Sequence, residues 1–214
     1  MKKTASSGAL RRRPYRQKAR AEASEATARR IMEAFFECRN QRWYDEITLE
    51  ELAKRAGVTV RTVIRRFGGK GGLMASTFQH IAPRIRHQRT VAPGDVTSAI
   101  ARVVELYEEL GDAAIRDLAQ EPRQPALKPV MELGRQGHRA ITAGAFSPWL
   151  DLLPEDRRRE AVDALVIALD VYTWKLLRRD MGRTVDETKI VMRGLVDAIL
   201  SHHSASTKSS GKGS

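Results

Sequence analysis

Residues 48–68 predict two short amphipathic helices joined by a tight turn, a pattern that few folds accommodate. Thr48 and Glu51 match a capping box, in which each side chain satisfies an unpaired backbone N–H of the other residue. From Leu49 onward the apolar residues recur at i, i+3, i+4 and i+7, which is the spacing of one buried helix face. Gly57 then supplies a left-handed stop, so the first helix ends there.

The second helix of the pair begins at Thr59, a good N-cap, and ends at Gly68. One of its sides is an apolar stripe at the same spacing, formed by Val60, Val63, Ile64 and Phe67. The opposite side is polar and basic, and it carries Arg61, Thr62, Arg65 and Arg66. The sequence therefore predicts a helix with one face buried and one cationic face in solvent.

A longer helix is predicted ahead of this pair, starting near Ser24. Its apolar stripe consists of Ile31, Ala34, Phe35 and Cys38. Cys38 on that stripe is most simply a small buried hydrophobic residue rather than a reactive thiol. Two short helices with a glycine turn, packed on a preceding helix, make a helix-turn-helix, whose second helix enters the major groove of DNA.

The cationic face suits DNA, because arginine donates to guanine O6 and N7 and to phosphate, and threonine contacts phosphate or a thymine methyl. The residues predicted to contact bases are Val60, Arg61, Thr62 and Arg65. Those predicted to hold phosphates are Thr48, Thr59, Arg66 and Lys70. A run of charge is usually a solvated face, but its place on a capped helix within a basic segment favours DNA.

The formal net charge of +12 belongs to the first part of the chain. Residues 1–90 hold 21 Lys and Arg against 8 Asp and Glu, whereas residues 91–214 hold 17 against 18. This asymmetry indicates a polyanion-binding end and a second part with another role. Residues 1–24 are predicted to form a basic arm that is disordered alone. It either orders on nucleic acid or serves as a solvated tail that aids solubility.

Nearly all of the chain after residue 24 follows helical periodicity, and no stretch alternates strictly enough to predict a strand. The predicted fold is all-α, with a three-helix helix-turn-helix domain at 25–90 and a second helical domain at 91–203. Residues 204–214 are predicted as a disordered tail of Ser, Gly and Lys. The helix that follows Lys70 is expected to bend or break near Pro83.

A single helix is predicted over residues 154–180, and its central part at 161–177 is apolar nearly all round. Such a helix must bury more than one face, either as the central helix of a monomer or against a partner chain. The last helix, 185–202, carries a further row of apolar residues. A helix-turn-helix that reads a palindrome needs two copies, and this favours a homodimer over a monomer.

Several classes of protein are disfavoured by the composition. No apolar run is long enough for a membrane span, no secretory signal follows the first residues, and a single cysteine forms no intrachain disulfide. A cytoplasmic, nucleoid-associated protein is therefore expected. The five histidines show no metal-ligand spacing and no nucleophile motif is present, so no metal, cofactor or catalytic residue is predicted and an enzyme is disfavoured.

The segment from Thr48 to Leu73, TLEELAKRAGVTVRTVIRRFGGKGGL, resembles the DNA-binding domain of the tetracycline-repressor-type (TetR) transcriptional regulators. The matching positions are Thr48, Leu52, Ala53, Ala56, Gly57, Val58, Thr59, Thr62, Val63, Phe67, Lys70 and Leu73. The likeness extends over residues 26–73. Ile64 departs from it, since the family usually has a tyrosine there that reaches a phosphate.

The resemblance implies a helical second domain that holds a small-molecule pocket and a four-helix dimer interface. The residues predicted to line the pocket are Tyr107, Met131, His138, Phe146, Trp149 and Trp174. Those predicted at the dimer interface are Leu165, Leu169, Leu176, Ile190, Leu195 and Ile199. Each of these side chains has an alternative role in the core or on the surface of a single chain.

The hypothesis that follows is a homodimeric repressor that a small-molecule effector releases from a palindromic double-stranded DNA operator. One alternative is a sequence-tolerant architectural DNA-binding protein driven by the basic arm. Another is a regulator with no small-molecule effector. A hydrolase or transferase built on the helical domain is disfavoured by the missing catalytic motifs.

Overall fold

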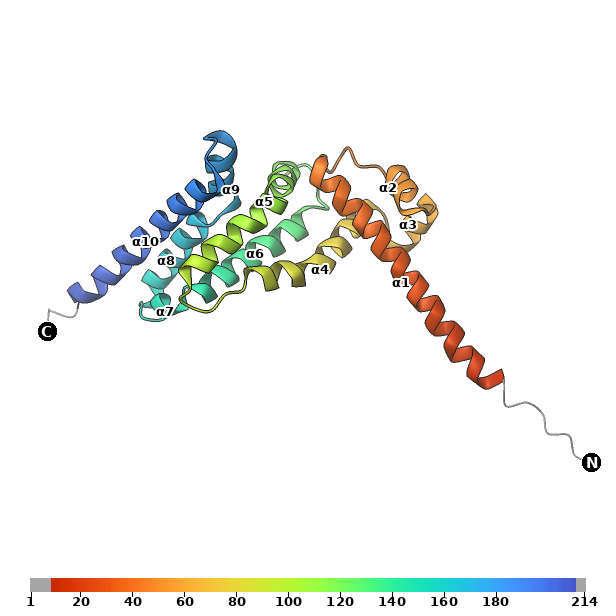
Figure 1. Cartoon of the computed structure of the whole chain (residues 1–214), viewed down its shortest axis with the longest axis horizontal. Helices are drawn as coiled ribbons and strands as arrows, with labels where there is room; N and C mark the ends of the chain where they lie inside the picture. The colour runs from red at the N-terminus through yellow and green to blue at the C-terminus, as the bar shows by residue number, and fades with distance from the viewer. Residues whose placement is uncertain (1–8, 211–214) are drawn as a thin grey trace, which may run out of the picture.

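The computed structural model describes the backbone of residues 9–210 and the side chains of residues 17–204. All regular elements in this range are helices, as the sequence predicts. Figure 1 shows an elongated arrangement with α1, α2 and α3 towards one end and α10 at the other. The elements are α1 (Ala9–Gln41), α2 (Leu49–Ala56), α3 (Val60–Phe67), α4 (Lys70–Arg89), α5 (Val96–Gln120), α6 (Lys128–Ala145), α7 (Ser147–Leu150), α8 (Glu155–Ala168), α9 (Val171–Lys175), the π-helical turn η1 (Leu176–Asp180) and α10 (Val185–Ser210).

The first core joins α1, α2, α3 and the start of α4. Ile31 and Phe35 of α1, Leu52 of α2 and Val63 of α3 have no solvent exposure, as the apolar stripes of the sequence predict. Cys38 is also buried, and burial raises the pKa of its thiol. The three predicted helices therefore form because each has one apolar face, and they stay together because those faces are buried against one another.

Helix α1 begins at Ala9, so residues 9–24 are helical where the sequence analysis predicts a disordered arm. The difference has a local cause, since this stretch is rich in Ala, Arg, Lys, Gln and Glu, which are strong helix formers. The first half of α1 projects away from the other helices (Figure 1), and residues 17–25 are exposed. Residues 1–8 of the predicted arm lie outside the described part of the chain.

The last helix also continues further than predicted, because α10 extends through Ser210 instead of ending near residue 203. Of the predicted tail, only residues 211–214 lie outside the described range. Helix α4 likewise continues past Pro83, where a bend or break is expected from the missing N–H of proline.

The second core is formed by α5, α8, α9 and α10, with Trp174 fully buried at its centre. Gly111 of α5 makes this packing possible, because a Cβ at that position would lie 2.4 Å from the Trp174 ring. The Trp174 Nε1–H donates to Glu108 Oε1 at 2.8 Å, so its one polar atom is satisfied. The helices of this second region therefore depend on a close contact between one glycine and one indole.

The single helix predicted over 154–180 is instead divided into α8, α9 and η1. The division falls at Asp170, which has an extended backbone (φ −77°, ψ 155°). Its side chain accepts a hydrogen bond from the backbone N–H of Tyr172 at 2.9 Å, so Asp170 is the N-cap of a new helix. The near-continuous apolar pattern of this stretch conceals the cap.

The two cores are not separated at residue 90, because part of α6 packs into the first one. Leu127 and Val130 are buried against the three-helix core, and Met131 extends the same contact. A Cβ on Gly71, at the start of α4, would lie 3.1 Å from Ala126 Cβ. The helix-turn-helix region is therefore closed on one side by residues from the second half of the chain.

Candidate nucleic-acid interface

The turn between α2 and α3 is fixed by two helix caps and one glycine. The Thr48 Oγ1 accepts a hydrogen bond from the Glu51 N–H at 3.2 Å, and the Thr59 Oγ1 accepts one from the Thr62 N–H at 3.2 Å. Gly57 adopts the left-handed conformation (φ 65°), as the sequence predicts. These contacts set the angle at which α3 leaves α2.

Only half of the predicted capping box forms at the start of α2. The Glu51 carboxylate accepts from Arg42 Nη1 at 2.6 Å and from Arg55 Nη2 at 3.1 Å, and no bond to the Thr48 N–H is made. Glu51 therefore ties the end of α1 to α2, since ion pairs with two arginines compete successfully with one backbone N–H.

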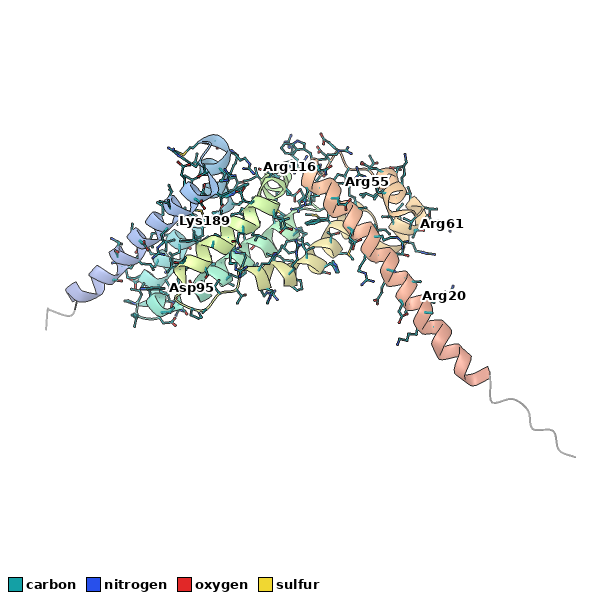
Figure 2. The ribbon with its side chains drawn as sticks, viewed as in Figure 1. Arg20, Arg55, Arg61, Asp95, Arg116 and Lys189 are labelled. Carbon is teal, nitrogen blue, oxygen red and sulfur yellow. The ribbon has the colours of Figure 1, made fainter. Side chains whose placement is uncertain are left out.

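The outer face of α3 presents two exposed arginines, Arg61 and Arg65. Within the part of the chain that the structure describes, neither guanidinium makes a hydrogen bond or ion pair. Figure 2 shows Arg61 at the end of the molecule opposite to Lys189 and Asp95. This face is therefore cationic and accessible, as a helix that enters a DNA groove requires.

Three other predicted contact residues on α3 lie beside this pair. Val60 and Thr62 are half-buried, and the Thr62 hydroxyl lies 3.0 Å from that of Thr59. Arg66 is exposed, and its Nη1 donates to Ser24 Oγ of α1. The end of α3 is thereby connected to the projecting half of α1, where further basic residues lie.

Ile64 was predicted on the buried stripe of α3, but its side chain is 48% exposed. On a helix that buries Val63 completely, Ile64 lies at the edge of the buried face and shares the outer face with Arg61. Ile64 is not among the contact residues that the sequence predicts. The feature of the sequence that points to Ile64 is its departure from the family pattern, which has a tyrosine at this outward-facing position.

Lys70 was predicted to hold a phosphate, but in the structure its ammonium is occupied within the protein. Its Nζ donates to Tyr44 O at 2.8 Å and to Ile47 O at 2.9 Å, and it lies 4.5 Å from the centre of the Tyr44 ring. Burial lowers the pKa of Lys70, and nearby Asp45 opposes the shift. Lys70 therefore anchors the loop between α1 and α2. Thr48 and Thr59, by contrast, are exposed.

A cavity of about 450 Å³ lies between α1, α4, α5, α6, α8 and α9. Its apolar walls include Phe78, Ile81 and Ile85 of α4 and Leu106, Leu110 and Leu118 of α5. Three of the residues predicted to line a pocket are among its lining residues: Tyr107, Met131 and His138. A cavity of this volume with mainly apolar walls is typical of small-molecule sites.

The other three predicted pocket residues lie elsewhere. Phe146 is fully buried in the second core, and Trp149 lines a separate depression next to Leu152 and Leu200. Trp174 is enclosed by Gly111, Tyr107 and Arg179. None of the three lines the cavity of 450 Å³, and Phe146 and Trp174 instead fill space within the second core.

Residues 31–77, which contain the capped α2–α3 pair, match the sequence model of the family described as "Bacterial regulatory proteins, tetR family". The helix-turn-helix of this chain is of the TetR type. The chain is thus a DNA-binding transcriptional regulator, as the sequence predicts.

Solved structures share the fold of this chain over most of its length. A TetR-family transcriptional regulator from Streptomyces coelicolor is 18% identical, with a TM-score of 0.69, over 87% of this chain and 86% of that chain. A protein from Pseudomonas aeruginosa PAO1 described as a transcriptional regulator is 16% identical, with a TM-score of 0.66, over 83% of this chain and 92% of that chain. A comparison with curated protein sequences gives no match.

The residues predicted at the TetR dimer interface divide into two groups. Leu165 and Leu169 are buried in the second core of their own chain, so they are not available to a partner and that prediction is wrong. Leu176, Ile190 and Leu195 are exposed by 52%, 70% and 42%, and Ile199 is half-buried.

In the described part of the chain, no helix is both long and apolar enough to cross a membrane.

Proposed function

We propose that this TetR-family chain acts as a homodimeric repressor, which a small molecule releases from a palindromic DNA operator. Arg61 and Arg65 read base edges in the major groove, since both are exposed on the outer face of α3. Thr62 and Val60 flank them and supply shorter contacts, including one to a thymine methyl. Ile64 joins this apolar contact, because it lies on the same face.

Phosphate contacts are assigned to the exposed residues Thr48, Thr59 and Arg66. Thr48 and Thr59 open α2 and α3, where the helix dipole and the first N–H groups favour an anion. Lys70 is left out of this group, because its ammonium already donates to two loop carbonyls.

The homodimer is supported by an exposed apolar stripe on α10. Val191, Gly194, Leu195 and Ala198 are all exposed and recur at i, i+3, i+4 and i+7. Ile167 of α8 is 67% exposed, and α8 packs beside α10. Exposed apolar side chains on two neighbouring helices are typical of an interface between subunits. Two copies would place two α3 helices for the two half-sites of a palindrome.

The proposal is supported above all by the position of α4, which connects the helix-turn-helix with the cavity. One end of this helix holds Lys70, which anchors the loop before α2, and the other end holds Arg89, which lines the cavity. The helix has 20 residues and so spans about 30 Å. A ligand that shifts α4 in the cavity would therefore move the helix-turn-helix and change the separation of the two α3 helices.

The proposal is tested by selecting a preferred duplex from random DNA and measuring its affinity and stoichiometry with the full chain. A palindromic preference, with two chains bound per site, supports it. Leu195→Glu, which places a charge on the exposed stripe, is expected to abolish the dimer and the palindromic preference, while the matched exposed variant Arg102→Glu retains both.

A sequence-tolerant architectural role is the second candidate, because the sequence of the projecting half of α1 is basic. Deleting residues 1–20 separates the two. An architectural protein would bind selected and random DNA equally and lose both with the arm. A regulator would keep its preference for the palindrome. A regulator without an effector would keep that preference and respond to no ligand.

A further inference from the structure

Among the four arginines that line the cavity, three are paired with carboxylates. Arg39 binds Asp117, Arg135 binds Glu121 and Glu132, and Arg139 binds Asp163. The fourth is Arg89, the last residue of α4. It is 8% exposed, and among the described residues no carboxylate lies within 4 Å of its guanidinium.

The hydrogen bonds of Arg89 leave most of its donors without a protein partner in the described chain. Its Nη2 donates to His138 Nδ1 at 2.8 Å, and this is its one such bond there. Since arginine only donates, Nδ1 must be the accepting nitrogen of His138, and the proton lies on Nε2. That Nε2–H donates to Val166 O at 3.1 Å, so the neutral imidazole is held in one orientation.

Among the described residues, no other group near Arg89 supplies the missing negative charge. Burial, together with Arg89, lowers the pKa of His138 to about 4, so the ring is neutral at physiological pH. Burial raises the pKa of Tyr107 to about 12, and its hydroxyl donates to Leu169 O at 3.2 Å. Asp170 lies on the far side of His138, with its Oδ2 4.0 Å from Nε2, and caps α9 through Oδ1.

A buried guanidinium without a counter-ion is unfavourable, because its desolvation is not offset. We propose that the cavity binds an organic monocarboxylate, whose carboxylate pairs with the Arg89 guanidinium and whose apolar body lies against α4 and α5. A planar guanidinium matches the two oxygens of a carboxylate. One monoanion suffices, because the other three arginines of the cavity are already neutralised by protein carboxylates.

This inference names the ligand class of the small-molecule site, so it rests on the proposed function for its regulatory meaning. The test measures the melting temperature of the full chain at neutral pH with matched pairs of probes. Each pair is a carboxylate and its primary amide, from hexanoate to tetradecanoate and from phenylpropanoate to naphthylacetate. At least one carboxylate is expected to raise the melting temperature while its amide does not.

The best carboxylate is then titrated against Arg89→Gln, with Arg102→Gln as an exposed charge-matched control. Arg89→Gln is expected to weaken binding by roughly tenfold to a hundredfold, and the control to bind as the wild type does. If Arg89→Gln does not fold, the comparison of acid and amide pairs on the wild-type chain still tests whether the cavity binds a carboxylate. Equal binding of acid and amide, unchanged affinity in Arg89→Gln, or no binding by any carboxylate overturns the proposal.

Displacement of the selected duplex distinguishes this inference from the proposed function. A carboxylate that binds through Arg89 but leaves the DNA complex intact supports the ligand class and contradicts effector release. A neutral compound that displaces the DNA, with no carboxylate bound at Arg89, supports effector release and contradicts the ligand class.

Discussion

Arg39 of α1 and Asp117 of α5 form a buried ion pair at the junction between the helix-turn-helix region and the second helical region. Next to it, Arg116 Nη2 donates to Arg39 O at 3.1 Å and to Asn40 O at 2.7 Å, at the C-terminal end of α1. Cationic donors are favoured at such an end by the helix dipole. Residues from α5 therefore hold the end of α1 through charge as well as packing.

Breaking this pair should be costly, because it leaves one charge buried and unpaired. Burial raises the pKa of Asp117, and Arg39 opposes the shift. Asp117→Asn is expected to lower the free energy of unfolding by about 3–5 kcal/mol, as measured by urea denaturation. Asp163→Asn, which breaks an exposed pair with Arg139, is the control and should lower it by less than about 1 kcal/mol. Equal effects of the two variants would contradict the assignment.

The anchoring role of Lys70 predicts a loss of stability rather than of phosphate binding. Lys70→Met keeps the aliphatic chain but removes the bonds to Tyr44 O and Ile47 O, so the free energy of unfolding should fall by about 1–3 kcal/mol. The salt dependence of DNA binding should stay as in the wild type. Arg66→Met is the counterpart, and it should reduce the salt slope by about 1. A reduced salt slope in Lys70→Met would show instead that Lys70 contacts a phosphate.

Because the pKa of His138 is lowered, the protein is expected to become less stable as the pH falls. Its pKa is about 4 in the folded chain against 6.5 for an ordinary histidine, so below pH 6.5 the unfolded chain binds a proton that the folded chain does not. The free energy of unfolding should fall between pH 6.5 and 4, by up to about 3 kcal/mol. His203, whose pKa is also lowered, contributes in the same direction.

The contribution of His138 to this pH dependence is isolated by comparison with His138→Gln, whose side chain does not titrate. The difference in free energy of unfolding between the wild type and His138→Gln should shrink as the pH falls from 6.5 to 4, because only the wild type loses this stabilisation. A difference that is independent of pH would show that His138 titrates normally in the folded state.

Replacing Gly111 by a larger residue is expected to overpack the second core. A Cβ there would lie 2.4 Å from Trp174 Cζ3 and 2.6 Å from Cη2, so Gly111→Ala must displace a fully buried indole. The expected loss is about 1–3 kcal/mol, read from thermal unfolding and from the near-ultraviolet circular dichroism. Gly137→Ala in α6 is the control. No atom lies within 4 Å of the added Cβ, and the change should stabilise the helix by up to about 1 kcal/mol.

The helix-turn-helix could be predicted because its signals are local. Thr48, Gly57 and Thr59 act on neighbouring backbone groups, so their roles follow from spacing alone, and the structure confirms them. The exposure of Ile64 was missed because a helical stripe has an edge, and tertiary packing decides on which side of it a residue lies.

The cavity and its charge could not be predicted in this way. Arg89 is near its closest partner, His138, only because α4 packs beside α6, and the two residues are 49 positions apart. The same limit applies to Lys70, whose basic side chain suggests phosphate until the loop carbonyls of Tyr44 and Ile47 are placed around it. Long-range contacts decide which cations are neutralised, and spacing along the chain carries no record of them.

Arg61 and Arg65 on α3 are proposed to give this chain its sequence preference. The most direct measurement is the ratio of affinities for the selected duplex and a scrambled duplex, at one salt concentration, for the wild type, Arg61→Ala, Arg65→Ala and the exposed control Arg102→Ala. Each α3 variant is predicted to lose about 1–3 kcal/mol of this preference, while the control keeps it. An unchanged ratio in both α3 variants would contradict the account.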